Sequence, residues 1–247
     1  MRPTLAGSWR VRDVTAHLLD TALRRVSSGR DGWRPPNAPR LTGSEPDFVA
    51  FINELNAAWI RAAERLSPRV LTDLYASAGA ALAELFESAA LEAPAAIGVS
   101  WAGEERSAAW LDIGREFTEV WHHGAQIRDA VGAGPLSDPE WLRAVLTIAL
   151  HALPHAYRAV HADLGVAVIV EISGPAGGTW TLSHFDRRWD INEGESRRAA
   201  ARATIEDEAA WRLWFNALKP PAAERAVRIE GDPALVRPLL TARSVIV

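Results

Sequence analysis

Apolar residues recur at spacings of three and four over most of the first 160 residues, a pattern typical of amphipathic helices. Two start signals, Ser67-Pro68 and Asp138-Pro139, support this reading, because proline is favoured in the first turn of a helix. Together they predict helices over 10–28, 45–66, 68–91, 108–131 and 139–160. The segments 29–46 and 93–107 lack periodicity and are expected to be loops.

After Gly165 the apolar period changes to two, which is typical of strands. Valines alternate over 166–170 and apolar residues over 180–182, with a glycine-rich turn between them, so we expect a β-hairpin. Further strands are expected at 187–195, 201–205, 226–229 and 245–247, and helices at 206–218 and 233–240. The predicted fold class is therefore α+β, with a helical bundle over 1–162 and a small α+β domain over 163–247.

The helix expected at 108–131 carries the strongest chemical signal. Glu119 and His123 lie four residues apart, and therefore on one face, one turn from each other. A carboxylate and an imidazole so placed can bind one metal ion, but a catalytic metal needs a third ligand from elsewhere in the chain. His122 lies about 100° around an ideal helix from His123, so we expect it on the surface or beside the site.

Apolar residues on the same helix indicate which side is buried. Phe117, Val120, Ile127 and Val131 recur at helical spacing and are expected to face neighbouring helices. Gly132 is expected to end the helix, because glycine readily adopts the left-handed conformation of a helix C-terminus.

His17 is a second candidate, on the helix expected at 10–28 and next to its apolar stripe. Asp13, one turn earlier, could orient the imidazole through a hydrogen bond. A lone histidine on an apolar face is more often a hydrogen-bonded core residue than a ligand. Spacing alone therefore leaves both readings of His17 open.

Composition limits the chemistry that is possible. The chain has 27 basic and 31 acidic residues and a net charge of −4, which argues against nucleic-acid binding. It has no cysteine, so disulfides, cysteine nucleophiles and cysteine-ligated zinc are excluded, and any thiol must come from a small molecule. No apolar run approaches about 18 residues and no signal peptide is apparent, so we expect a cytoplasmic protein without a membrane-spanning segment.

Two segments carry a family resemblance: Gly7-Ser-Trp-Arg-Val-Arg-Asp-Val-Thr-Ala-His17-Leu18 and Glu119-Val-Trp-His-His123-Gly-Ala-Gln126-Ile127. They resemble the two signatures of the mycothiol-dependent maleylpyruvate isomerase N-terminal domain, a DinB-like four-helix bundle. This resemblance implies that His17, Glu119 and His123 bind a divalent metal, often zinc, with nickel or manganese as alternatives. Segments around Trp180 and Gly231 resemble the sterol-carrier-like domain that follows the bundle in many members.

The chain departs from the family pattern in two places. Members normally have an additional helix before the first signature, whereas this chain begins six residues before it. Either the start lies upstream, or the helices of 45–91 complete the bundle. Some members also have a Gly-Arg pair near the helix of the C-terminal domain, where this chain offers only Arg212 as a candidate thiol-binding residue.

The resemblance implies a metal-dependent thiol transferase or isomerase that uses a low-molecular-weight, mycothiol-like thiol as cosubstrate. Gln126, one turn beyond His123, is a candidate for a hydrogen bond near the metal. We expect a small-molecule substrate and a monomer or homodimer. Two alternatives remain: a hydrolase in which metal-bound water is the nucleophile, and a non-catalytic protein that binds a small apolar ligand.

Overall fold

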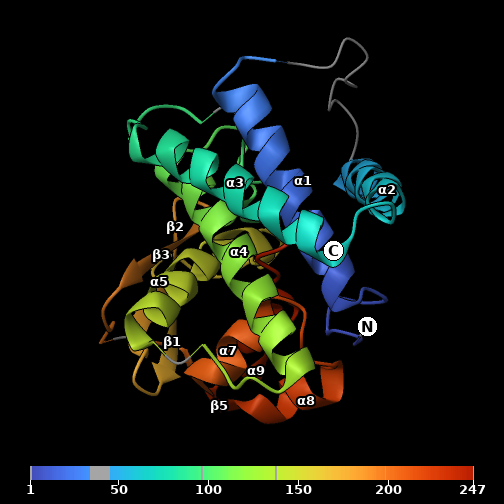
Figure 1. Cartoon of the computed structure of the whole chain (residues 1–247). Helices are drawn as coiled ribbons and strands as arrows, with labels where there is room; N and C mark the ends of the chain where they lie inside the picture. Colours follow the sequence, from blue (N-terminus) through green and yellow to red (C-terminus); the bar gives the residue numbers. More distant parts are fainter. Residues whose placement is uncertain (1, 34–44, 96, 137, 198, 247) are drawn as a thin grey trace. The chain divides into compact units, whose positions relative to one another are not determined.

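The computed structural model describes residues 2–33, 45–95, 97–136, 138–197 and 199–246 (Figure 1). The chain divides into two compact units. The first comprises Met1–Ile97 with Ser107–Pro135, and the second Gly98–Arg106 with Leu136–Val247. The predicted α+β class is confirmed, with a helical first unit and a five-stranded sheet in the second.

Within the described residues, the first unit contains α1 (Val11–Gly29), α2 (Glu45–Ala63), α3 (Pro68–Glu87) and α4 (Ala109–Val131). These bounds lie within a few residues of the predicted helices, although residues 34–44 of the predicted loop lie outside the described part. Helix α3 also starts where the sequence predicts, after Ser67. The Ser67 hydroxyl accepts a hydrogen bond from the Val70 amide. The predicted four-helix bundle itself remains a prediction.

An apolar cluster joins α1 to α2 and α3. Its buried members are Ala16, Leu19, Ala22, Val26, Ala63, Leu71, Ala78 and Leu82. Two polar contacts also tie α2 to α1: the Trp59 indole donates to the Ala16 carbonyl at 2.8 Å, and Arg12 donates to the carbonyls of Ala63 and Leu66. An arginine that binds the last carbonyls of a helix satisfies groups that otherwise have no helical partner.

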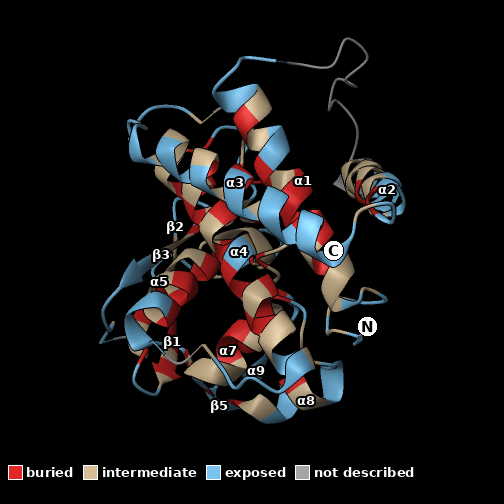
Figure 2. Ribbon diagram, viewed as in Figure 1, coloured by how far each residue is buried: buried red, intermediate tan, exposed pale blue. Residues whose placement is uncertain are grey.

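Helix α4 ends as predicted, but its buried face is not the predicted one. Gly132 has a φ of +72° and closes the helix through hydrogen bonds to the preceding turn. Val120 and Val131 are exposed, at 44% and 45%, so the expectation that they face neighbouring helices is wrong. The buried positions (Figure 2) include many polar side chains and are Leu111, Asp112, Gly114, Glu116, Thr118, Trp121, His122, His123, Ala125 and Gln126.

The single helix predicted over 139–160 is instead two, α5 (Pro139–Leu150) and α6 (Ala152–Ala156). Pro154 explains the break, because it has no amide hydrogen and its ring would clash with the carbonyl of Leu150 in a continuous helix. Both helices belong to the second unit, where α5 contacts α7 (Asp207–Trp214) and α6 contacts β3 (Arg188–Glu193). This division therefore falls earlier in the chain than the predicted domain boundary at residue 162.

The second unit is built on one sheet in the order β3-β2-β1-β4-β5. Its other strands are β1 (Ala167–Ser173), β2 (Gly178–Phe185), β4 (Ala201–Glu206) and β5 (Val227–Gly231). The predicted hairpin pairs β1 with β2 antiparallel, while β1 and β4 pair in parallel. Residues 167–170 of β1 and alternate residues of β4 are buried, and between the two strands Glu171 forms an ion pair with Arg202 at 2.6 Å.

The helices after the sheet differ from the prediction in detail. Helix α7 ends at Trp214 rather than near 218, and Asn216 follows it with a φ of +57°. Helix α8 (Pro220–Ala226) was not predicted, whereas α9 (Pro233–Thr241) was. Residues 245 and 246 form no strand, contrary to expectation. Within the described residues, no helix combines the length and apolarity needed to cross a membrane.

Candidate metal centre

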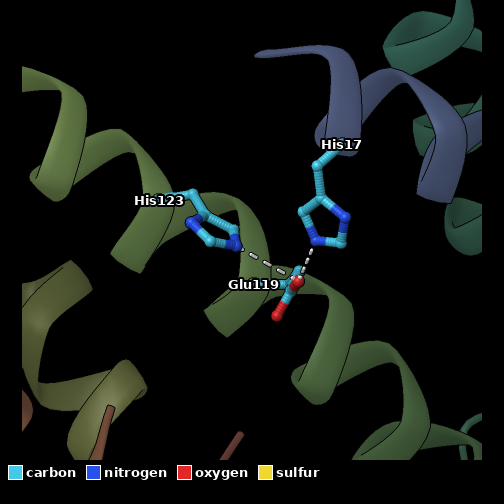
Figure 3. A group of neighbouring side chains, drawn as sticks. All are labelled: His17, Glu119 and His123. Carbon is cyan, nitrogen blue, oxygen red and sulfur yellow. Dashed lines mark hydrogen bonds and ion pairs between the residues drawn. The ribbon is translucent and has the colours of Figure 1, made fainter. Parts of the chain in front are cut away.

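Three side chains from distant parts of the sequence meet in the first unit. His17 extends from α1, and Glu119 and His123 extend from α4 (Figure 3). The Nε2 atom of His17 lies 2.7 Å from Glu119 Oε1, and the Nε2 atom of His123 lies 3.4 Å from the same oxygen. One ligand atom from each residue lies within 4.8 Å of the other two. Among the described residues, this is the group of histidine and acidic side chains whose spacing suits a metal ion.

All three side chains of this cluster are largely buried. The side chains of His17 and His123 are each 7% exposed, and that of Glu119 is 20% exposed. Burial raises the pKa of the Glu119 carboxyl, but the hydrogen bonds with His123 and His17 outweigh burial and hold that pKa well below its usual range. Glu119 is therefore a carboxylate at neutral pH, the form that binds metal.

Gln126 fixes the tautomer of His123. Its Oε1 atom can only accept a hydrogen bond, so the His123 Nδ1–H at 2.8 Å is the donor. The Nε2 atom of His123 is the one that faces Glu119, 3.4 Å from its Oε1 atom. Gln126 thus contacts a residue of the cluster, and its role at a metal site remains a prediction; such partners commonly orient metal-binding histidines.

Asp13 does not orient His17, contrary to expectation. Its carboxylate accepts a hydrogen bond from the Arg10 amide at 3.0 Å and caps the start of α1 instead. The Nδ1 atom of His17 is buried and has no hydrogen-bond partner among the described residues. The Nε2 atom of this ring is the one that faces Glu119.

His122 is buried, so the expectation that it could be a surface residue is wrong. It is 2% exposed, its Nδ1 atom lies 2.8 Å from the Thr118 carbonyl, and its ring centroid lies 4.1 Å from that of His123. Burial lowers the pKa of His122 to about 3, so the ring is neutral at physiological pH. The ring therefore supports His123 from the side, as the second predicted alternative allows.

Trp9 is a part of the site that the sequence did not single out. Its ring centroid lies 4.9 Å from that of His17 and 6.2 Å from that of His123. The Trp9 carbonyl accepts hydrogen bonds from the amide and hydroxyl of Thr4, which hold the segment before α1 in place. The position of Trp9 within the first family signature could have indicated that it belongs to the site. Helical spacing could not, because Trp9 precedes the helix.

Trp9→Phe is expected to remove most of the change in tryptophan fluorescence that accompanies metal binding, because this indole lies beside both imidazoles. Titration of the apoprotein with Zn²⁺, followed by emission, measures the effect. Trp33→Phe is the matched control, since its amide bonds to the Ser27 carbonyl, ten residues and about 15 Å along α1 from His17. A Trp9→Phe variant that keeps the full signal would contradict the placement.

Arg212 lies in the second unit and is bound locally. Its Nη2 atom lies 2.7 Å from Glu208 Oε1, one turn earlier on α7, and its guanidinium stacks 4.4 Å from the Trp211 ring centroid. Its role as a thiol-binding residue remains a prediction.

Comparison with known proteins agrees with this geometry. The sequence profile of the family described as mycothiol maleylpyruvate isomerase N-terminal domain matches residues 1–128. A search of curated proteins gives no match. Among solved structures, a histidine-to-alanine mutant of the mycothiol-dependent maleylpyruvate isomerase is similar, with a TM-score of 0.52, 11% identity and coverage of 92% of this chain and 80% of that one.

A second kind of solved structure resembles part of the chain. The sterol carrier protein domain 2 of Helicoverpa armigera matches with a TM-score of 0.32 and 17% identity, covering 44% of this chain and 91% of that one. The family profile spans just over half of the sequence and includes all three residues of the cluster. The chain therefore belongs to the mycothiol maleylpyruvate isomerase N-terminal domain family and is a maleylpyruvate isomerase-like protein.

Proposed function

We propose that this protein is a divalent-metal-dependent enzyme that activates a low-molecular-weight thiol for isomerisation or transfer to a small electrophilic substrate. His17, Glu119 and His123 would hold the metal, with zinc as the expected ion. The observation that carries the proposal is the convergence of their ligand atoms within 4.8 Å, in a member of this family.

The donor set fits a catalytic ion. Two imidazoles and one carboxylate leave at least one position open on a tetrahedral centre, which is the arrangement of catalytic rather than structural zinc sites. A divalent cation bound there would stabilise the anionic form of a thiol near neutral pH.

The protein's own residues would supply charge, orientation and cover. Glu119 contributes one negative charge, and Gln126 keeps the Nε2 atom of His123 turned toward it. Trp9 lies against both imidazoles, where it would limit the access of water to one side of the site.

The thiol itself would have to be brought in, since the chain contains no cysteine. The similar solved structure is described as mycothiol-dependent, and a mycothiol-like thiol is therefore the first cosubstrate to test. Maleylpyruvate, named in the same description, is the first electrophile.

The test is a chelation and reconstitution experiment on the full chain. Metal is measured in the purified protein, removed with a strong chelator, and restored with Zn²⁺, while the isomerisation of maleylpyruvate is followed with and without mycothiol. Turnover should need both thiol and metal, and should return on reconstitution. Hydrolysis that needs metal but not thiol would support a hydrolase instead, and ligand binding that is indifferent to the chelator would support a carrier.

A further inference from the structure

The three candidate ligands come from two helices, α1 and α4. The cluster that buries α1 draws its members from α1, α2 and α3. Between α1 and α4, the described contacts include those of His17 with Glu119 and His123, and those of Arg25 with Asp112 and Glu116. The spacing of His17 from the two ligands on α4 therefore depends on polar contacts as well as on packing.

Arg25 bridges the two helices at one place. Its Nη2 atom lies 2.5 Å from Asp112 Oδ2, and its Nε atom lies 3.5 Å from Glu116 Oε1. Arg115 binds the same two carboxylates from α4, with its Nη2 atom 2.8 Å from each. The side chains of Asp112 and Glu116 are only 5% exposed, and that of Arg25 is 14% exposed. Two cations and two anions thus form a balanced, buried ion cluster.

The ion cluster and the metal centre lie along the same two helices. Arg25 follows His17 by eight residues on α1, about 12 Å, and Asp112 precedes Glu119 by seven residues on α4, about 10.5 Å. Both intervals are close to two helical turns, and their opposite order shows that the helices run antiparallel there. Two contacts about 11 Å apart on one interface fix both the sliding and the rotation of α1 against α4.

We propose that Arg25 is a positioning residue for the metal centre: its fork, bound to Asp112 and Glu116, sets the register in which His17 meets Glu119 and His123. Fixing register is a well-attested role of buried polar groups, whose net contribution to stability is often small. Arginine suits this task because its guanidinium is planar and can engage two carboxylates, whereas a lysine ammonium acts as a single point charge. The inference rests on the proposed metal function of the same site.

The experiment compares the full chain with Arg25→Met and Arg25→Lys, using competition with a chromophoric chelator to measure Zn²⁺ affinity. Arg25→Met removes the contacts with Asp112 and Glu116 and is expected to weaken Zn²⁺ binding about 10-fold or more, as for other groups that support metal ligands. The helical circular dichroism should be retained. Arg25→Lys is expected to fold and to lie between the parent and Arg25→Met. The absorption bands of bound Co²⁺ should shift in both variants, because the ligand geometry changes.

Two controls distinguish a positioning role of Arg25 from a general loss of stability in the first unit. Arg30→Met also removes an arginine from a carboxylate at the end of α1, but Arg30 and its partner Asp31 are both exposed, at 57% and 49%, so affinity should stay within about threefold of the parent. Leu82→Ala loosens the apolar cluster between α1 and α3 and should lower the melting temperature without the same loss of affinity.

The experiment distinguishes failure of the proposed metal-dependent function from failure of the proposed positioning role of Arg25. If the parent protein binds no Zn²⁺, the proposed function fails. If the parent binds Zn²⁺ and Arg25→Lys binds it equally tightly with an unchanged Co²⁺ spectrum, only the positioning role is overturned. The same conclusion follows if Leu82→Ala weakens binding as much as the Arg25 variants do.

Discussion

His123→Ala is expected to purify without stoichiometric metal and to remain folded. The substitution removes one of three proposed ligands, and since loss of a residue that merely supports a ligand costs about 10–100-fold in affinity, loss of the ligand itself should cost at least that much. We expect the first unit to fold without metal, because its apolar cluster buries side chains worth roughly 1.5–3 kcal/mol each for leucine. Metal analysis and circular dichroism together measure both halves of the prediction.

Two variants on the same helix sharpen this result. Glu119→Gln should also lose metal, since a neutral amide is a poor ligand for a divalent cation. His122→Ala should keep it, because this ring contacts the side of His123 and is outside the group of converging ligand atoms. If His122→Ala lost the metal and His123→Ala kept it, that result would show that the site had been assigned to the wrong histidine.

Asp112→Asn is expected to destabilise the first unit by about 3–5 kcal/mol. The neutral amide leaves two buried guanidiniums, those of Arg25 and Arg115, to share the single carboxylate of Glu116. An uncompensated charge in the interior is costly because its lost hydration is not replaced. Chemical denaturation followed by far-ultraviolet circular dichroism, which reports on the helices, measures the loss.

Asp190→Asn provides the control for that measurement. Asp190 lies 3.1 Å from Arg188, but both side chains are largely exposed, at 47% and 75%. Exposed ion pairs are worth under about 1 kcal/mol, so this variant should unfold close to the parent. Equal effects in the two variants would show that the ion cluster contributes no more than a surface pair.

The sequence predicted where helices and strands lie better than it predicted which of their faces are buried. Gly132 and the helical spacing located α4, but its buried side carries polar as well as apolar side chains, and Val120 is 44% exposed. Apolar periodicity misleads when the interior face carries the chemistry, as functional sites often break the local pattern. Pro154 was available to predict the break after α5, whereas the parallel pairing of β1 with β4 depends on distant residues and has no local signal.

Helical spacing in the sequence could predict only part of the candidate site. Glu119 and His123 share a helical face, which a single sequence reveals, but spacing left the role of His17 open, and the family resemblance favoured a metal ligand. Their convergence is confirmed by the geometry, while their role as metal ligands stays a prediction. The Arg25–Asp112 contact could not be predicted, because periodicity does not distinguish an inward charged side chain from the many that face solvent.

The distance of 102 residues between His17 and Glu119 along the chain has a consequence for how the protein would acquire its metal. During synthesis, the first ligand leaves the ribosome about 100 residues before the second, so a nascent chain offers only a single imidazole for most of that time. A metal bound to the finished site would act as a cross-link that closes a very long loop, and it would stabilise the folded state by about 4 kcal/mol at a thousand times its dissociation constant. Metal loading of the proposed enzyme would therefore follow folding, and a cell short of the metal would accumulate folded apoprotein rather than unfolded chains.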